Sequence, residues 1–130
     1  MREKVDALLK ADRNVNLVVL GDFNDTYNTP SIKAIVGRGN SSSSLIDTRP
    51  SERNGDNKPN PTNPRYFPRN IAWTHYYGVE DTYSRIDYIL LSHGMAREWV
   101  TNETYVLATA NWGAASDHRP VVATFEATNK

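Results

Sequence analysis

The sequence predicts an α/β fold in which a mainly antiparallel sheet carries helices on its outer face. Two segments have apolar residues at helical spacing, and several others are rich in β-branched and aromatic residues, which is typical of strands. The 130 residues fit one domain, and a hydrophobic content of 38% is enough to build a core. No internal repeat is present, and the apolar runs are too short to span a bilayer.

The charge and cysteine content exclude several classes of function. Fifteen basic and fifteen acidic residues give a formal net charge of zero, so no overall field attracts nucleic acid or a membrane surface. An anionic ligand would therefore be bound by local groups. The absence of cysteine excludes disulfides, thiolate metal sites and thiol catalysis. The composition leaves the localisation unknown.

The N-terminal part predicts a helix followed by a buried strand. In residues 2–12, REKVDALLKAD, the side chains of Val5, Leu8 and Leu9 recur at helical spacing, and charged residues occupy the outer face. Residues 16–22, NLVVLGD, are apolar at consecutive positions, which is typical of a strand covered on both faces. We therefore expect residues 16–22 to form a central strand.

A second helix is expected over residues 31–37, SIKAIVG. Thr29 is a suitable N-cap, Pro30 favours the first helical position, and Gly37 favours the end of a helix. Residues 44–48, SLIDT, then predict a weak strand.

Residues 49–70 predict an irregular proline-rich loop, because five of the seven prolines lie between Pro50 and Pro68. Basic residues and the pair Tyr66 and Phe67 would suit binding of a nucleic-acid backbone and its bases, but a solvated loop explains the same composition.

The rest of the chain predicts strands with one helical turn between two of them. The strands are IAWTHYY (71–77), SRIDYILLS (84–92), ETYVLAT (103–109) and RPVVATFEA (119–127), and the turn is GMAREWV (94–100).

Three groups of polar residues lie at the ends of predicted strands. They are Asp22 and Asn24 after the first strand, Arg85 and Asp87 near the start of SRIDYILLS, and Asp117 and His118 before RPVVATFEA. Because the start of one strand meets the end of its antiparallel neighbour, the groups can converge at one rim. Carboxylates, an amide, a guanidinium and an imidazole together suit metal-assisted phosphoryl chemistry, which needs no serine or cysteine nucleophile.

The motifs that carry these residues resemble a known superfamily. GDFND at 21–25, RIDYILLS at 85–92 and SDHRPV at 116–121 occur in that order. They are similar to the three C-terminal signatures of the endonuclease/exonuclease/phosphatase superfamily, which includes abasic-site endonucleases, deoxyribonuclease-I-like nucleases, sphingomyelinases and inositol-phosphate phosphatases. The resemblance extends from about Asn16 to Phe125. It implies one half of a four-layer α/β sandwich and hydrolysis of a phosphoester with Mg²⁺ or Mn²⁺.

The resemblance also implies a role for each matching residue. Asp22 would orient or deprotonate the attacking water and bind the metal, and Asn24 would contact the scissile phosphate. Asp87 would position His118, which would stabilise the phosphate in the transition state. Asp117 would act as a metal ligand.

Two further residues are candidates for binding substrate, and every group has a structural alternative. Arg85 lies beside Asp87 on one strand face, where the two could instead form an ion pair. His75 lies in an aromatic cluster and is either a substrate contact or a packed strand histidine. Residues 21–25 would also suit an Asx turn, and His118 would suit a surface pair with its neighbouring aspartate.

The sequence departs from the superfamily in lacking an earlier half with a metal-binding glutamate. The one glutamate before Asp22 is Glu3, which lies in a helical pattern. We therefore expect residues 1–130 to be the C-terminal half of such a domain. The uncovered inner face of its sheet predicts a homodimer, or a partner that supplies the N-terminal half.

Two functions follow from this departure, and the sequence leaves both open. One is a nuclease, phosphodiesterase or phosphatase that requires a divalent metal. The other is a non-catalytic binding or assembly module that keeps the fold without the metal-binding glutamate. The substrate of the enzyme could be DNA, RNA, a phospholipid headgroup or a sugar phosphate.

Overall fold

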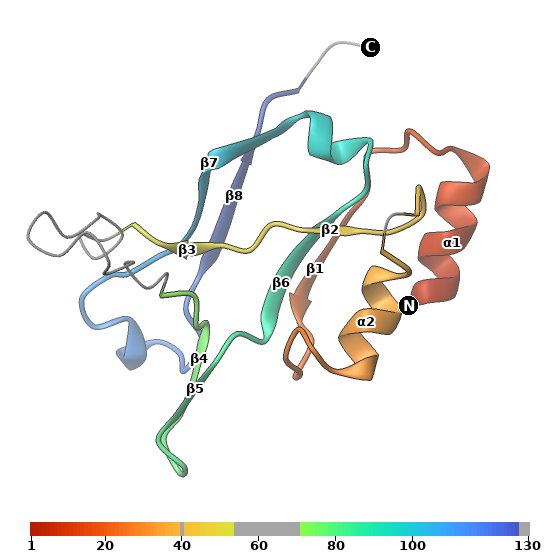
Figure 1. Ribbon diagram of the computed structural model, residues 1–130. Helices are drawn as coiled ribbons and strands as arrows, with labels where there is room; N and C mark the ends of the chain where they lie inside the picture. The colour runs from red at the N-terminus through yellow and green to blue at the C-terminus, as the bar shows by residue number, and fades with distance from the viewer. Residues whose placement is uncertain (40, 54–70, 128–130) are drawn as a thin grey trace, which may run out of the picture.

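The computed structural model describes residues 1–39, 41–53 and 71–127, and they form a small mixed α/β fold with mainly antiparallel sheets and few helices (Figure 1). Most of the predicted loop at 49–70, including Tyr66 and Phe67, lies outside the described residues. The elements, in chain order, are α1 (Arg2–Ala11), β1 (Val18–Asp22), α2 (Pro30–Val36), β2 (Ile46–Asp47), β3 (Ser51–Glu52), β4 (His75–Tyr77), β5 (Thr82–Ser84), β6 (Asp87–Leu91), η2 (Met95–Arg97), β7 (Trp99–Val106), η3 (Trp112–Ala114) and β8 (Val121–Phe125). None of the described helices is long and apolar enough to cross a membrane.

The strands of the described residues form two three-stranded sheets and one hairpin. Strand β6 lies between β1 and β2 and is antiparallel to both. Strand β7 lies between β3 and β8, antiparallel to β8 and parallel to β3. Strands β4 and β5 pair as an antiparallel hairpin. The prediction of a mainly antiparallel α/β fold is therefore confirmed, whereas the four-layer sandwich stays a prediction.

Helices α1 and α2 lie side by side and contribute to the hydrophobic core with β6 (Figure 1). The buried members of this cluster are Val5, Leu9, Ile32, Leu45, Tyr88 and Leu90. The predicted helix at 2–12 is confirmed, but the prediction that Leu8 shares its buried face is wrong, because Leu8 is 47% exposed. Val5 and Leu9 are four residues apart and therefore face the same way, whereas Leu8 is turned about 100° from Leu9 around the helix.

The predicted limits of α2 are confirmed. Thr29 is the N-cap, Pro30 is the first helical residue, and Gly37 follows the helix with a φ of 86°. Since that φ lies in the region that favours glycine, the sequence signal at Gly37 has a direct structural cause. The Thr29 hydroxyl donates a 2.8 Å hydrogen bond to the Thr26 carbonyl and accepts none from the backbone N–H groups of the helix.

The prediction that residues 16–22 form a central strand is wrong. Strand β1 lies at one end of its described sheet, and β6 takes the central position. Leu90 and Leu91 in β6 are fully buried, whereas Leu20 in β1 is 65% exposed. An apolar run indicates that a strand has two apolar faces, but pairing along its edges depends on other segments of the chain.

Several strand limits also differ from the prediction. The segment 71–77 is a strand only at His75–Tyr77, and the segment 84–92 contributes to two strands, β5 and β6. The hairpin arises because the chain reverses over residues 78–81, where Asp81 has a φ of 51°. Strand β7 begins at Trp99, four residues before the predicted start. The helical turn expected at 94–100 is confirmed as η2.

Substitution of two adjacent leucines in α1 tests the burial of its inner face. Leu9→Ala is expected to lower the free energy of unfolding by about 2–5 kcal/mol, because it leaves a cavity in the core cluster. Leu8→Ala changes the helix propensity in the same way, but it removes contacts only from a half-exposed side chain, so its cost is expected to stay below about 1 kcal/mol. Urea unfolding of both variants measures the difference. Equal losses would contradict the described orientation of α1.

Candidate active site

The site begins where β1 ends and β6 begins. In the antiparallel register of these strands, Asp22 lies directly opposite Asp87, and Gly21 lies opposite Tyr88. Gly21 has a φ of 139°, and no atom beyond its two neighbours in the chain lies within 4 Å of the place where a Cβ would stand. Its backbone conformation, rather than crowding, therefore favours glycine at the residue that precedes Asp22.

Asp22 uses its two carboxylate oxygens differently. Oδ1 accepts a 2.8 Å hydrogen bond from the backbone N–H of Asn24, whose φ of 52° places it in the left-handed region. Oδ2 lies 4.0 Å from Nε2 of His118. The Asx-turn interpretation of residues 21–25 is therefore correct for one oxygen, while the other oxygen faces the imidazole. The Asn24 side chain lies at the exposed end of this turn.

His118 and Asp87 form the shortest contact between two side chains of the site. Nδ1 of His118 lies 3.0 Å from Oδ2 of Asp87, a distance that suits an Nδ1–H donated to the carboxylate. Thr74 supports this arrangement, because its buried hydroxyl oxygen accepts 3.2 Å hydrogen bonds from the backbone N–H groups of Ile86 and Asp87. These hydrogen bonds fix the start of β6, and with it the position of Asp87 next to the imidazole of His118.

The charges around His118 change its acidity. Burial lowers the pKa of His118, but the hydrogen bond to Asp87 and the negative charges of the surrounding aspartates outweigh this effect, so the pKa is raised above 6.5. The ring is about one-third exposed, so solvent and ligands can reach it. An imidazole of this kind can carry a positive charge close to neutral pH.

Backbone hydrogen bonds place His118 beside the β4 strand. The N–H of Tyr76 donates to the Asp117 carbonyl at 3.1 Å, and the N–H of Arg119 donates to the Thr74 carbonyl at 2.6 Å. His75 and His118 are consequently bridge partners, and their ring centroids are 4.6 Å apart.

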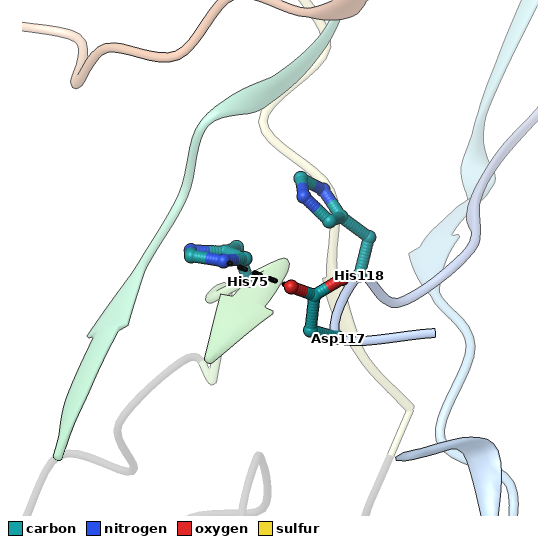
Figure 2. Close-up of side chains that lie close together, drawn as sticks. All are labelled: His75, Asp117 and His118. Atoms are coloured by element: carbon teal, nitrogen blue, oxygen red, sulfur yellow. Dashed lines mark ion pairs between the residues drawn. The ribbon is translucent and has the colours of Figure 1, made fainter. Parts of the chain in front are cut away.

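Asp117 extends from the same segment toward His75. Its Oδ2 lies 3.6 Å from Nε2 of His75, and Figure 2 shows the two side chains beside the ring of His118. The Asp117 side chain is 69% exposed, whereas the His75 side chain is only 17% exposed.

Among the described residues, two overlapping groups of side chains could hold a metal ion. One contains Asp22, Asp87 and His118, and the other contains His75, Asp117 and His118. Within each group the donor atoms lie within 4.8 Å of one another. Asp22 and Asp117, which the sequence predicts as ligands of one metal, therefore fall in different groups that share His118. A glutamate belongs to neither group among the described residues.

Arg85 is held by a different partner from the one that its position suggests. Its guanidinium makes two hydrogen bonds to the carboxylate of Asp47, at 3.0 and 2.6 Å, and stacks 4.4 Å from the ring centre of Tyr88. The alternative of an Arg85–Asp87 ion pair is wrong, because Asp87 binds His118 instead. A substrate contact by Arg85 stays a prediction.

A pocket of about 280 Å³ adjoins the site. Its lining comes from the ends of β1, β6 and the segment before β8, namely Leu20, Gly21, Asp87, Tyr88, Ile89, Arg119, Pro120 and Val121. Asp87 is the member of the site that reaches it. The pocket is mostly apolar beside that carboxylate, which suits a ligand with an apolar part next to a polar group.

Two residues that position the site were missed by sequence reasoning. Thr74 is fully buried and supports Asp87. Arg119 is 3% exposed, forms an ion pair with Glu52, and lies with its guanidinium 4.1 Å from the ring centre of Trp73. Neither has a sequence signal of its own, because threonine is common in strands and an arginine before proline resembles a surface residue.

The acidity of His118 is open to direct measurement. In metal-free protein, an NMR titration is expected to give a pKa for His118 above 6.5, and Asp87→Asn is expected to lower it, because the neutral amide no longer stabilises the imidazolium. The stability that this raised pKa provides is fully present below about pH 6.5, the unfolded-state value, and is lost as the pH rises through the folded-state value.

The control for this titration is Asp12→Asn, which removes a carboxylate that follows α1. Oδ1 of Asp12 binds the backbone N–H of Asn14, away from the site. A His118 pKa that responds equally to both substitutions, or to neither, would contradict the Asp87 contact.

The comparison with known protein families agrees with these motifs. A model of the Endonuclease/Exonuclease/phosphatase family matches residues 2–118, from the start of α1 to His118. Searches of curated proteins and of solved structures returned no significant match. Members of this family are generally hydrolases of phosphoesters, and they typically depend on a metal. Because the match covers most of the 130 residues, the chain belongs to the endonuclease/exonuclease/phosphatase family.

Proposed function

We propose that the protein hydrolyses a phosphoester with the help of a divalent metal, through Asp22, Asn24, Asp87 and His118. The observation that supports this function best is the position of His118 between two carboxylates. Its Nδ1 is 3.0 Å from Asp87, while its Nε2 faces Asp22 at 4.0 Å. The hydrogen bond to Asp87 thus fixes Nδ1, whereas Nε2 can bind a ligand next to Asp22, which can act as a general base.

Each side chain has a distinct part in this reaction. Asp87 accepts the hydrogen bond from Nδ1–H of His118, orients the ring and favours the imidazolium, in which Nε2–H can donate to a phosphoryl oxygen as negative charge develops. Asp22 is the base that orients or deprotonates the attacking water through Oδ2, the oxygen not used in the turn. The exposed amide of Asn24 adds a hydrogen bond to the phosphate.

The donor set fits a hard divalent cation. The cluster of Asp22, Asp87 and His118 offers carboxylate oxygens, which Mg²⁺ and Mn²⁺ prefer, and its exposure leaves room for water and substrate ligands. When bound, such an ion would polarise a phosphoryl oxygen. Asp117 belongs to the second group around His118, and its exposed carboxylate can serve as a further ligand.

Two residues are candidates for binding the rest of the substrate. The ring of His75 lies next to that of His118, and His75 is the first residue of β4 in the aromatic hairpin of β4 and β5. Arg85 would have to leave its pair with Asp47 to reach an anion, so His75 is the better candidate of the two. The substrate is a phosphoester, and nucleic acid is one example; a net charge of zero requires that it be bound locally.

The proposed roles predict large effects on the rate in the longest encoded chain that contains these 130 residues. Asp22→Asn and His118→Ala are each expected to lower Mg²⁺- or Mn²⁺-dependent hydrolysis of a phosphodiester by at least about 10²-fold, the usual scale for loss of an acid, a base or a charge stabiliser. His93→Ala is the matched control, because His93 approaches Ser44 rather than the site.

The 130-residue chain should be assayed beside the longest one. Little or no turnover is expected from it, because its described clusters offer few ligands and no glutamate to a metal. Strong hydrolysis that His118→Ala abolishes would contradict that expectation. Wild-type rates in both variants of the longest chain would overturn the assigned roles, and failure of that chain to hydrolyse any phosphoester would favour a non-catalytic binding module.

We also propose that residues 1–130 form the C-terminal half of a four-layer sandwich and pair with a second copy of the chain. Val19 belongs to the core that the helices cover, whereas the next residue, Leu20, points to the other face and is 65% exposed. An apolar sheet face left in water favours association. A two-fold pair would bury this face twice.

Light scattering tests this association. The chain is expected to be dimeric at micromolar concentration, and Leu20→Glu is expected to shift it to monomer, because the charge would be buried at the interface. Val79→Glu is the control, since Val79 is 82% exposed and lies in the turn between β4 and β5. A folded wild-type monomer under these conditions would refute the dimer.

A further inference from the structure

We propose that His75, Asp117 and His118 form a binding site for a first-row transition metal such as Zn²⁺ or Co²⁺, distinct from the carboxylate cluster at Asp22 although the two share His118. This site does not depend on the proposed hydrolysis, because it follows from the geometry and chemistry of its own side chains. Figure 2 shows the three residues, which come from β4 and from the segment before β8.

The backbone fixes the two histidines face to face. The hydrogen bonds that flank them, Tyr76 to Asp117 and Arg119 to Thr74, make His75 and His118 a non-hydrogen-bonded antiparallel pair. In such a pair the Cα atoms are about 4.5 Å apart, and the side chains extend from the same face. The ring centroids lie 4.6 Å apart, as this pairing requires.

The distances between donor atoms suit one small ion. Ligands bound at about 2.0–2.2 Å in a tetrahedral site are about 3.3–3.6 Å apart. Nε2 of His75 and Oδ2 of Asp117 are already 3.6 Å apart. One ligand atom from each of the three residues lies within 4.8 Å of those from the other two. Small rotations about side-chain bonds would close the remaining gap. The exposed Asp117 carboxylate has the freedom to make them.

The second nitrogen of His118 supports metal binding. Its Nδ1 is hydrogen-bonded to Asp87, which leaves Nε2 as the donor to an ion. A carboxylate that holds the far side of a histidine in this way is typical of metal-bound histidines, because it fixes the tautomer and strengthens the ligand. Since Asp22 also approaches Nε2, a metal in this site and the Asp22 contact compete for the same nitrogen.

The donor types distinguish this site from the neighbouring one. Two imidazoles and one carboxylate favour Zn²⁺, Co²⁺ or Ni²⁺, whereas Mg²⁺ prefers oxygen ligands. The chain has three histidines and no cysteine, and the third histidine, His93, lies near Ser44 instead. His75 and His118 are therefore the one pair of imidazoles that can share an ion within a single chain.

Titration of the metal-free 130-residue chain with Co²⁺, followed by visible absorption and calorimetry, tests the site. One Co²⁺ is expected to bind per chain, and the ion is expected to broaden the NMR signals of the His75 and His118 rings. His75→Asn is expected to weaken binding by at least about 10-fold, through loss of a direct ligand. His93→Asn is the matched control and should bind as wild type. Circular dichroism confirms that each variant is folded.

Three outcomes would overturn the proposal. The first is Co²⁺ binding that His75→Asn leaves unchanged. The second is displacement of Co²⁺ by millimolar Mg²⁺, together with equal weakening by Asp22→Asn, which would place the ion in the carboxylate cluster. The third is broadening of the NMR signals of the His93 ring, and not of the His75 ring, in the wild-type protein. This measurement does not require that the His75→Asn variant folds.

Discussion

The antiparallel pairing of β1 with β6 is the constraint on which the site depends. It sets Asp22 opposite Asp87, so two carboxylates separated by more than sixty residues in the chain meet at one end of a ladder. The same ladder presents Val19 and Leu90 to the helices on its other face. A slip of one residue would exchange the two faces and move both the core and the carboxylates, so burial of the core also fixes the chemistry.

A second constraint brings His118 to this ladder. The segment at 117–119 pairs with β4, and Arg119 anchors it through the ion pair with Glu52 and the contact with Trp73. A buried charge is costly unless it is paired, so this anchor is stable only while Glu52 is in place. Nε of Arg119 is buried without a hydrogen-bond partner in the described structure, which adds to that cost. The anchor thus gives the histidine a fixed position at some expense in stability.

The electrostatics of the site differ from those of the whole chain. The chain is neutral overall, yet Asp22, Asp87 and Asp117 all lie close enough to His118 to raise its pKa. Three carboxylates would repel an anionic phosphoester, so positive charge at the site would favour the approach of such a substrate. An imidazolium would supply one positive charge, and a bound divalent metal would supply two more. A family whose members typically depend on a metal fits this local excess of negative charge.

The sequence by itself determined the features that depend on neighbouring residues in the chain. These are the helix limits at Thr29 and Gly37, the apolar strands, and the three motifs that identify the family. Helix caps, hydrophobic periodicity and motifs each depend on residues that lie close together in the sequence. The tertiary structure alone decided the contacts between distant segments. In the tertiary structure, β1 lies at the edge of its described sheet, and Arg85 forms an ion pair with Asp47. Asp22 and Asp117 belong to different groups of side chains that share His118. The physical reason is that a side chain's partner depends on strand order and register, which long-range pairing fixes and local patterns do not encode.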